Sequence, residues 1–434
     1  LDSAEPSTVT GTDDPATTSI DEAGTYRFSE LIPQSYIVRE QLQPGWELTT
    51  PLQNEITVVN LSSLNGTNGF RLDGSDSGDR FGFSVSNAGD VNGDGYDDLI
   101  IGARFAYSDQ GESYVVFGKP GEFNSVVNLG TLNGTNGFRL DGVDRGDQSG
   151  FSVSSAGDVN GDGFDDLIIG AYGADPGGRD RAGESYVVFG KSGGFASAID
   201  LSTLDGTTGF RLDGIDADDR AGYSVSSAGD VNGDGFDDVI IGAQLADPGG
   251  VNGAGASYVV FGKSSGFASV LDLSALDGTT GFRLDGIGPG HGSGGAVSSA
   301  GDVNGDGVDD LTIGARGGGA YNAGESYVVF GKLSGFASAM ELSTLDGTTG
   351  FRLDGIDSGS QSGFAVSNAG DVNGDGFDDL IIGAPGADPG GVNIAGESYV
   401  VFGKSGGFGS SIDLSTLDGT SGFRLNGIDT GDQS

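Results

Sequence analysis

The sequence predicts an all-β fold assembled from five copies of one sheet-forming unit, and three observations support this prediction. The hexapeptide Asp-Val-Asn-Gly-Asp-Gly occurs five times, at spacings of 68 to 72 residues. Gly-Phe-Arg-Leu recurs six times and Tyr-Val-Val-Phe-Gly-Lys five times, in step with the hexapeptide. Short runs of β-branched and aromatic residues lie between Gly, Asn, Asp and Pro clusters, and no stretch has a sustained helical period. Self-similarity at a fixed period is typical of a repeat protein.

The expected strands of one unit are clearest in the second copy. They are an alternating run at 150–154, an apolar run at 167–169, a mixed run at 185–189 and a longer segment at 199–212. Four short strands per unit are the make-up of a β-propeller blade. A β-solenoid is the alternative, but it favours shorter repeats. We therefore predict a β-propeller with five complete four-stranded blades, whose extra length lies in Gly-rich loops.

The charge and composition of the chain exclude several classes of function. Lys and Arg total 20 against 63 Asp and Glu, which gives a net charge of −43. Such a chain repels nucleic acid and anionic membranes. Cys is absent, so the chain has no disulfide, thiol nucleophile or zinc–thiolate site. No apolar run approaches the ~18 residues of a membrane helix, and we expect no membrane insertion.

Each hexapeptide opens an acidic loop with the ligand pattern of a calcium site. Positions 1, 3, 5 and 9 carry oxygen-bearing side chains, and a glycine at position 6 permits a sharp turn. Calcium takes roughly six to eight oxygen ligands, so the backbone carbonyl of position 7 and water would complete the set. The predicted ligands are Asp90, Asn92, Asp94, Tyr96 and Asp98; Asp158, Asn160, Asp162, Phe164 and Asp166; Asp230, Asn232, Asp234, Phe236 and Asp238; Asp302, Asn304, Asp306, Val308 and Asp310; Asp371, Asn373, Asp375, Phe377 and Asp379.

Two other structures share part of this pattern. An EF-hand loop needs a bidentate Glu at position 12, where this chain has Ile101 inside an apolar strand. A solvated Asn-Gly or Asp-Gly turn needs only two of these residues. Three aspartates within nine positions, repeated five times, would repel one another without a cation. We therefore expect about five calcium ions, one per complete repeat.

The units resemble FG-GAP repeats, the blades of the integrin α-subunit propeller and its bacterial relatives. Phe81-Gly82 and Gly383-Ala384-Pro385 match the name-giving elements, and the resemblance covers about 55–434. The resemblance implies a seven-bladed propeller in the intact protein, with calcium in the turn between the first two strands of a blade. It also implies partner binding by loops of the opposite face. Here those loops follow Gly-Phe-Arg-Leu or contain Ala-Asp-Pro-Gly-Gly.

The positions of the repeats set the expected domain boundaries. The propeller is expected over 53–434, and the chain, which begins with Leu and stops in mid-pattern, is expected to be a piece of a longer protein. Segment 56–72 should supply the outer strand of a further blade, and 412–425 the outer strand of the fifth unit. We therefore expect an open arc, or a ring with a gap of about two blades. The calcium loops span 90–98, 158–166, 230–238, 302–310 and 371–379.

Residues 1–52 lack the repeat and are expected to form a partial β-sandwich. Two alternating segments, at 25–28 and 36–40, are joined by a short turn, and Trp46 opens a third segment. The pattern is similar to the C-terminal part of a B-type, prealbumin-like stalk domain of bacterial surface adhesins. Gln34 stands where that family has Gly, so the turn is expected to differ.

Two features depart from the strict repeat. The fourth unit has Gly294-Gly295-Ala296-Val297 where the others have Gly-Phe-Ser-Val or a near variant, so we expect the loss of an inward Phe to weaken this blade. It also holds the only His, His291, which we interpret as a solvated loop residue. A second acidic pattern, interpreted as solvated turn residues, comprises Asp73, Asp76 and Asp79, Asp141, Asp144 and Asp147, and Asp213, Asp216 and Asp219.

The function expected from these observations is non-enzymatic. A calcium-stiffened propeller would present loops to an extracellular protein or glycan, at the cell surface or after secretion. The alternatives are a non-catalytic propeller within a larger secreted hydrolase or lyase, and a structural spacer. The chain has no Cys, one His and no Gly-x-Ser-x-Gly element, so we predict no catalytic residue and no cofactor other than calcium.

Overall fold

The computed structural model describes residues 60–74 and 76–433 of the 434. The chain divides into two units, Leu1–Ser63 and Leu64–Ser434, and all strands described here belong to the second unit. The stalk domain predicted for 1–52 lies outside the described residues.

The first blade is a sheet of four antiparallel strands in chain order. Its strands are β2 (Ser84–Gly89), β3 (Asp98–Ala103), β4 (Glu112–Val116) and β6 (Gly137–Asp141). The apolar run forms β3, whose side chains are almost all buried, as expected for a strand packed on both faces. The predicted all-β fold of four-stranded blades is therefore confirmed.

The other four blades repeat this order. Their strands are β7 (Ser152–Gly157), β8 (Asp166–Ala171), β9 (Glu184–Val188) and β11 (Gly209–Asp213); β12 (Ser224–Gly229), β13 (Asp238–Ala243), β14 (Ala256–Val260) and β16 (Gly281–Asp285); β17 (Ala296–Gly301), β18 (Asp310–Ala315), β19 (Glu325–Val329) and β21 (Gly350–Asp354); β22 (Ala365–Gly370), β23 (Asp379–Ala384), β24 (Glu397–Val401) and β26 (Gly422–Asn426).

A short parallel strand from the following repeat extends the first four sheets, and the sequence did not predict it. The segment 199–212, expected as one strand, contains β10 (Ala198–Asp200), which pairs with β6 of the preceding blade, and then β11 of its own blade. The chain turns between them because Asp200 accepts a hydrogen bond from Ser202 N at 2.9 Å and caps a 3-10 turn. The equivalent pairs are β5 (Val126–Asn128) with β1 (Arg71–Asp73), β15 (Val270–Asp272) with β11, β20 (Ala339–Glu341) with β16 and β25 (Ser411–Asp413) with β21.

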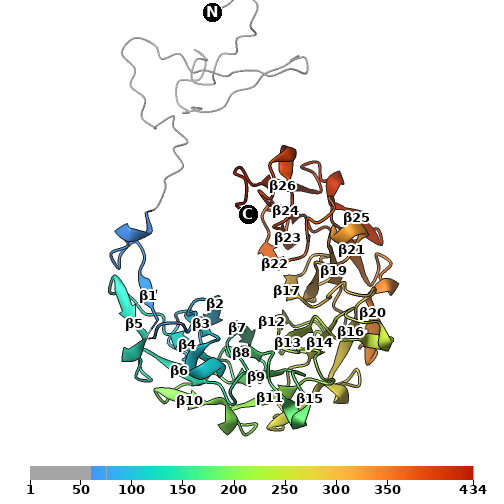
Figure 1. Ribbon diagram of the computed structural model, residues 1–434. Coiled ribbons are helices and arrows are strands. Elements are labelled where there is room, and N and C mark those ends of the chain that lie inside the picture. The colour runs from blue at the N-terminus through green and yellow to red at the C-terminus, as the bar shows by residue number, and fades with distance from the viewer. Residues whose placement is uncertain (1–59, 75, 434) are drawn as a thin grey trace, which may run out of the picture. The chain divides into compact units, whose positions relative to one another are not determined.

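The same pairing corrects the prediction for 412–425, whereas the further blade expected from 56–72 stays a prediction. In 412–425, β25 joins the fourth blade, and only β26 serves as the outer strand of the fifth. In the described part of 56–72, the strand β1 lies at the end of the segment, and β5 of the first blade is added to it (Figure 1). Successive blades are thus linked by an exchanged edge strand as well as by packing.

The hydrophobic core lies between neighbouring blades. Between the first and second blades, Ile100 and Phe138 pack against Ile169 and Tyr186. The first strands of the five blades lie side by side in chain order, from β2 to β22. Their contact is close because Gly102 faces Gly150 of the next repeat, and a Cβ on Gly102 would lie 2.0 Å from the Gly150 carbonyl oxygen. Among the described residues, no strand pairing joins the fifth blade to β1 or β2.

In the described residues, helical structure is confined to single turns. No helix in the described part of the chain has the length and apolar character needed to cross a membrane. The turns are α1 (Ala106–Asp109), η2 (Leu61–Ser63), η3 (Leu129–Thr131), η4 (Pro176–Gly178), η5 (Leu201–Thr203), η6 (Pro248–Gly250), η7 (Leu273–Ala275), η8 (Ala320–Asn322), η9 (Leu342–Thr344), η10 (Pro389–Gly391) and η11 (Leu414–Thr416).

Candidate metal-binding loops

Each acidic loop connects the first and second strands of a blade, and its first aspartate organises it. In the first blade, Asp90 Oδ1 accepts hydrogen bonds from Gly93 N at 2.8 Å and Asp94 N at 3.0 Å. Its Oδ2 accepts one from Gly95 N at 2.8 Å. Gly95, at position 6, has a φ of 86°, which a side chain would strain. The loop backbone therefore wraps around the carboxylate at position 1.

The aspartate at position 9 is buried in every loop. Both oxygens of Asp98 accept backbone hydrogen bonds, from Val91 N at 3.2 Å and Gly118 N at 2.8 Å. Burial raises the pKa of the Asp98 carboxyl to about 7, and the nearby Asp94 and Asp90 carboxylates add to this shift. Burial likewise raises the pKa to about 8 at each of Asp166, Asp238 and Asp310. The negative charge at position 9 thus lacks a compensating positive charge within the loop.

The side-chain amide of the asparagine at position 3 lies close to the same group through its nitrogen. Asn92 Nδ2 lies 3.5 Å from Asp98 Oδ2, so the amide lies beside the position-9 carboxylate. In the third loop, Asn232 Oδ1 is buried and has no hydrogen-bond partner in the described residues. An acceptor oxygen without a donor is the group that a hard cation would engage.

The structure brings only part of the predicted ligand set together. Positions 1, 3, 5 and 9 share a loop, but within the described residues no three acidic or histidine side chains form a group that could hold a metal. At position 7, the Phe164 ring lies against Gly93 of the preceding loop. Where the fourth repeat has Val308 instead of an aromatic residue, Leu333 occupies the equivalent place against Gly233.

The sequence analysis missed the aspartate at position 8. Asp165 Oδ2 accepts a hydrogen bond from Asp90 N of the preceding blade at 2.7 Å, so it ties two loops together. The signal was present in the sequence as the Asp-Asp pair that ends each loop. The equivalent bonds join Asp237 to Asp158 N, Asp309 to Asp230 N and Asp378 to Asp302 N.

The loops predicted to bind a partner lie at the other ends of the strands. In the first blade, the loop after β3 and the loop after β6 are hydrogen-bonded to each other: Ser149 N donates to Gln110 O, and Gly142 N to Gly111 O, both at 3.0 Å. Gln110 Nε2 also donates to the carbonyl oxygens of Gly142 and Val143. The two loops are therefore joined by hydrogen bonds and form one continuous surface.

Two interpretations made for these loops were wrong. Of the nine aspartates expected to be solvated, Asp147, Asp213 and Asp219 are buried. Burial raises the pKa of the Asp147 and Asp219 carboxyls to about 6. His291 aligns with them in the repeat and is also largely buried, with its Nδ1 3.5 Å from Glu325 Oε2. Local spacing did not indicate this, because the partners lie in other segments of the same blade, as Glu325 does for His291.

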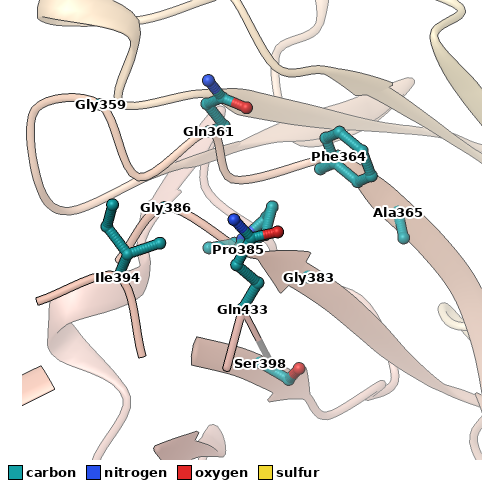
Figure 2. Close-up of a pocket in the computed structure, with 11 residues that line it drawn as sticks. Gly359, Gln361, Phe364, Ala365, Gly383, Pro385, Gly386, Ile394, Ser398 and Gln433 are labelled. Carbon is teal, nitrogen blue, oxygen red and sulfur yellow. The ribbon is translucent and has the colours of Figure 1, made fainter. Parts of the chain in front are cut away.

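A cavity of about 570 Å³ lies in the fifth blade at the same edge, and its lining includes Gln361, Phe364, Pro385 and Ile394 (Figure 2). Gly383 forms part of its wall. In the first blade the equivalent Gly102 is covered by Gly150 of the next repeat, whereas the nearest atom to a Cβ on Gly383 is the Ala365 Cβ at 3.6 Å. The cavity therefore marks the place that a following repeat occupies elsewhere.

Comparison with known proteins agrees with this architecture. The FG-GAP repeat matches residues 81–116, 149–188, 221–260, 293–329 and 362–401. Integrin alpha pat-2 of Caenorhabditis elegans is 31% identical over 248 residues, which are 55% of this chain and 18% of that protein. Integrin alpha-V of Gallus gallus is 33% identical over 38% of this chain and 15% of that protein.

A relative of another kind is also similar. Phosphatidylinositol-glycan-specific phospholipase D of Bos taurus is 35% identical over 41% of this chain and 21% of that protein. The chain thus spans about a fifth, or less, of the length of each of these relatives. Residues 81–401 are a domain of five FG-GAP repeats, similar to the integrin alpha subunits.

Proposed function

We propose that this chain is a calcium-binding, extracellular interaction module, which presents the loops opposite its acidic loops to a protein or glycan partner. The observation that carries the proposal is the fivefold acidic loop with a buried, uncompensated aspartate at position 9. The similarity to integrin alpha subunits supports an extracellular adhesion role at a cell surface or after secretion. A bacterial origin of the repeats, and attachment through a stalk domain at 1–52, belong to the same proposal.

The residues of each loop fit calcium in number and chemistry. Asp90, Asp94 and Asp98 would contribute carboxylate oxygens and Asn92 an amide oxygen, with the Tyr96 carbonyl as the backbone ligand. A divalent cation would offset the charge that burial disfavours at position 9. The unpartnered Asn232 Oδ1 supports the same assignment in the third loop.

Calorimetric titration of the EDTA-treated protein with calcium tests the metal assignment. We expect five ions per chain and a calcium-dependent rise in melting temperature, because a ligand that binds the folded state stabilises it. Asp238→Asn should reduce the count to four, and Asp180→Asn, an exposed aspartate outside the loops, should leave it at five. A melting temperature unaffected by EDTA would contradict the assignment.

A second function has one observation in its favour. The similarity to a phospholipase D is compatible with a non-catalytic propeller attached to a secreted enzyme. Screening the calcium-loaded chain against extracellular-matrix proteins and glycans separates the two. Saturable binding to one of them supports the interaction module, and no binding in either set favours a propeller that acts as an enzyme accessory or a spacer.

A further inference from the structure

Five arginines of this acidic chain have no acidic partner in the described residues, and three of them lie in the first three blades near one group of aromatic rings. Among the described arginines, eight contact a carboxylate. No ion pair is found for the remaining five, in the part of the chain that the structure describes. These are Arg80, Arg104, Arg145, Arg220 and Arg316. The chain has 63 acidic residues, so neighbouring arginines without an ion pair are unexpected.

Two of these arginines, Arg104 and Arg220, contact a cluster of aromatic rings from the first three blades, and Arg80 stacks on the neighbouring Phe105. The aromatic cluster consists of Phe83, Phe151, Tyr172 and Tyr223. Phe151 lies 5.0 Å from Phe83, 4.5 Å from Tyr172 and 4.8 Å from Tyr223 between ring centroids. Three of these residues precede the first strands of their blades and Tyr172 follows β8, so the cluster lies at the edge opposite the acidic loops.

Arg104 lies directly on this cluster. Its guanidinium carbon is 3.8 Å from the Phe83 centroid, 5.0 Å from that of Phe151 and 4.5 Å from that of Phe105. Arg80 stacks on the same Phe105 ring at 4.8 Å. These cation–π contacts hold two positive charges near one another.

Arg220 approaches the cluster from the third blade, 5.7 Å from the Tyr172 centroid. The Nε atoms of both Arg104 and Arg220 are buried and have no hydrogen-bond partner in the described residues. Burial and the neighbouring Arg80 charge both lower the pKa of Arg104. Aromatic faces compensate a cation only in part, so the positive charge and the Nε–H donors remain unsatisfied.

A bound oxyanion would accept hydrogen bonds from the arginines and would compensate their positive charge. Guanidinium groups bind planar carboxylates through paired N–H donors, and such charge-assisted bonds strengthen away from bulk water. Polyanions are disfavoured as ligands because the net charge of −43 repels them at long range. A single carboxylate on an otherwise neutral or basic protein surface meets the local positive charge without that penalty, and its carbon stem can contact the aromatic rings.

We propose that Arg104, with Arg80 and Arg220, forms a recognition site for one carboxylate side chain of a partner protein. The proposal rests on the proposed role as an interaction module and names the chemistry of its ligand. Arg104 is the principal donor, because it lies closest to the aromatic cluster.

The test titrates the full chain, labelled with 15N-arginine, with N-acetylglutamate at constant ionic strength while the arginine Nε–H signals are followed. We expect saturable shifts of the Arg104 and Arg220 signals, and no such shifts with N-acetylglutamine. Arg104→Gln should weaken binding at least tenfold, and Arg104→Lys, which keeps the charge but lacks the paired donors, should also weaken it. Arg145→Gln, an exposed arginine outside the cluster, should leave binding unchanged.

Unchanged melting temperatures of the variants show that they fold. Absence of a saturable shift, or equal weakening by Arg104→Gln and Arg145→Gln, would overturn the proposal. Tighter binding of a sulfated heparin oligosaccharide than of a peptide with one Glu would overturn it as well. None of these readouts depends on calcium stoichiometry or partner capture, so their failure leaves the proposed function standing.

Discussion

Asp147 and Asp219 show how a single buried residue couples stability to pH. Each carboxyl has a pKa raised by burial to about 6, above its ordinary value of 3.8. The folded state therefore binds a proton more readily than the unfolded chain. The stability that this provides is fully present below the ordinary pKa and is lost as the pH rises through about 6.

Replacement of Asp147 by Asn should remove the part of the pH dependence of stability that is due to the Asp147 carboxyl. The amide stays uncharged and keeps an oxygen that can accept from Asp144 N, now 3.0 Å from Asp147 Oδ2. We expect a gain in the free energy of unfolding on the order of 1–3 kcal/mol above pH 7 and a flatter profile between pH 4 and 7. Urea unfolding in saturating calcium measures both. The exposed Asp180→Asn should follow the parent profile; a parallel profile for Asp147→Asn would refute the assignment.

For single residues, the sequence predicted which residues share a loop better than it predicted their burial and their hydrogen-bond partners. Spacing alone identified the loop residues from Asp90 to Asp98 and their four copies. The Asp-Asp pair marks Asp165, but spacing did not show its role, because the hydrogen-bond donor belongs to another blade, 75 residues away. Spacing misjudged Asp147 and His291, because their partners lie in distant segments of the same blade, as Glu325 does for His291. Spacing identified residues within one loop, and it did not identify contacts between segments far apart in the sequence.

The position-8 aspartates act at the scale of whole blades. Asp165→Ala should lower the free energy of unfolding by about 1–3 kcal/mol. The Asp90 N–H would lose the carboxylate that accepts its charge-assisted hydrogen bond. Asp165→Asn retains an acceptor oxygen and should cost less. Asp97→Ala is the matched control, because no hydrogen bond to its side chain is found in the described residues. Equal losses from Asp165→Ala and Asp97→Ala in urea unfolding would contradict the link.

The fourth blade allows a stabilising change. Gly295 takes the place of an aromatic residue that was expected to point inward. In the other blades this ring is not fully buried, as Phe151 shows. Its absence at Gly295 therefore weakens the blade less than the loss of a core residue would. A Cβ on Gly295 would lie 3.2 Å from Gly292 O and 3.6 Å from Gln244 Oε1, and this backbone has no positive φ. The backbone conformation permits a side chain, and the contact with Gly292 O requires a shift of a few tenths of an ångström.

Gly295→Phe should therefore raise the free energy of unfolding by about 1 kcal/mol, from ring contacts and lower backbone entropy in the unfolded chain. Hydrogen exchange over 287–300 should slow in parallel. The adjacent Gly294→Ala should destabilise instead, because Gly294 has a φ of 82° and its Cβ would lie 2.5 Å from Ala256 O. A loss of stability in Gly295→Phe would show that the blade cannot accept the ring.

The strands themselves were largely predictable, and their partners only in part. Apolar runs such as 167–169 became the buried β8, because such runs form strands covered on both faces. The segment 199–212 was misread because its first three strand residues pair in parallel with the preceding blade. No local pattern distinguishes a strand that joins its own sheet from one that joins its neighbour.

At the scale of the whole domain, the first and fifth blades each expose a face that inner blades bury. Val85 is 65% exposed, whereas the equivalent Val153 is 4% exposed. Leu425 in the fifth blade is 50% exposed, whereas the equivalent Leu353 is fully buried. Because every inner interface joins these two kinds of face, the face of the fifth blade is complementary to that of the first.

This complementarity predicts head-to-tail association of the chain. The contact is heterologous, so it can propagate beyond a dimer. The net charge of −43 opposes it, and added salt should strengthen it by screening that repulsion. Sedimentation velocity over a concentration series in calcium should show association that rises with salt. Leu425→Lys and Val85→Lys should each suppress it, since each places a charge in the apolar contact. Leu245→Lys, which alters an exposed loop residue of the third blade, should not. A chain that remains monomeric at every concentration and salt level would show that these faces do not bind one another.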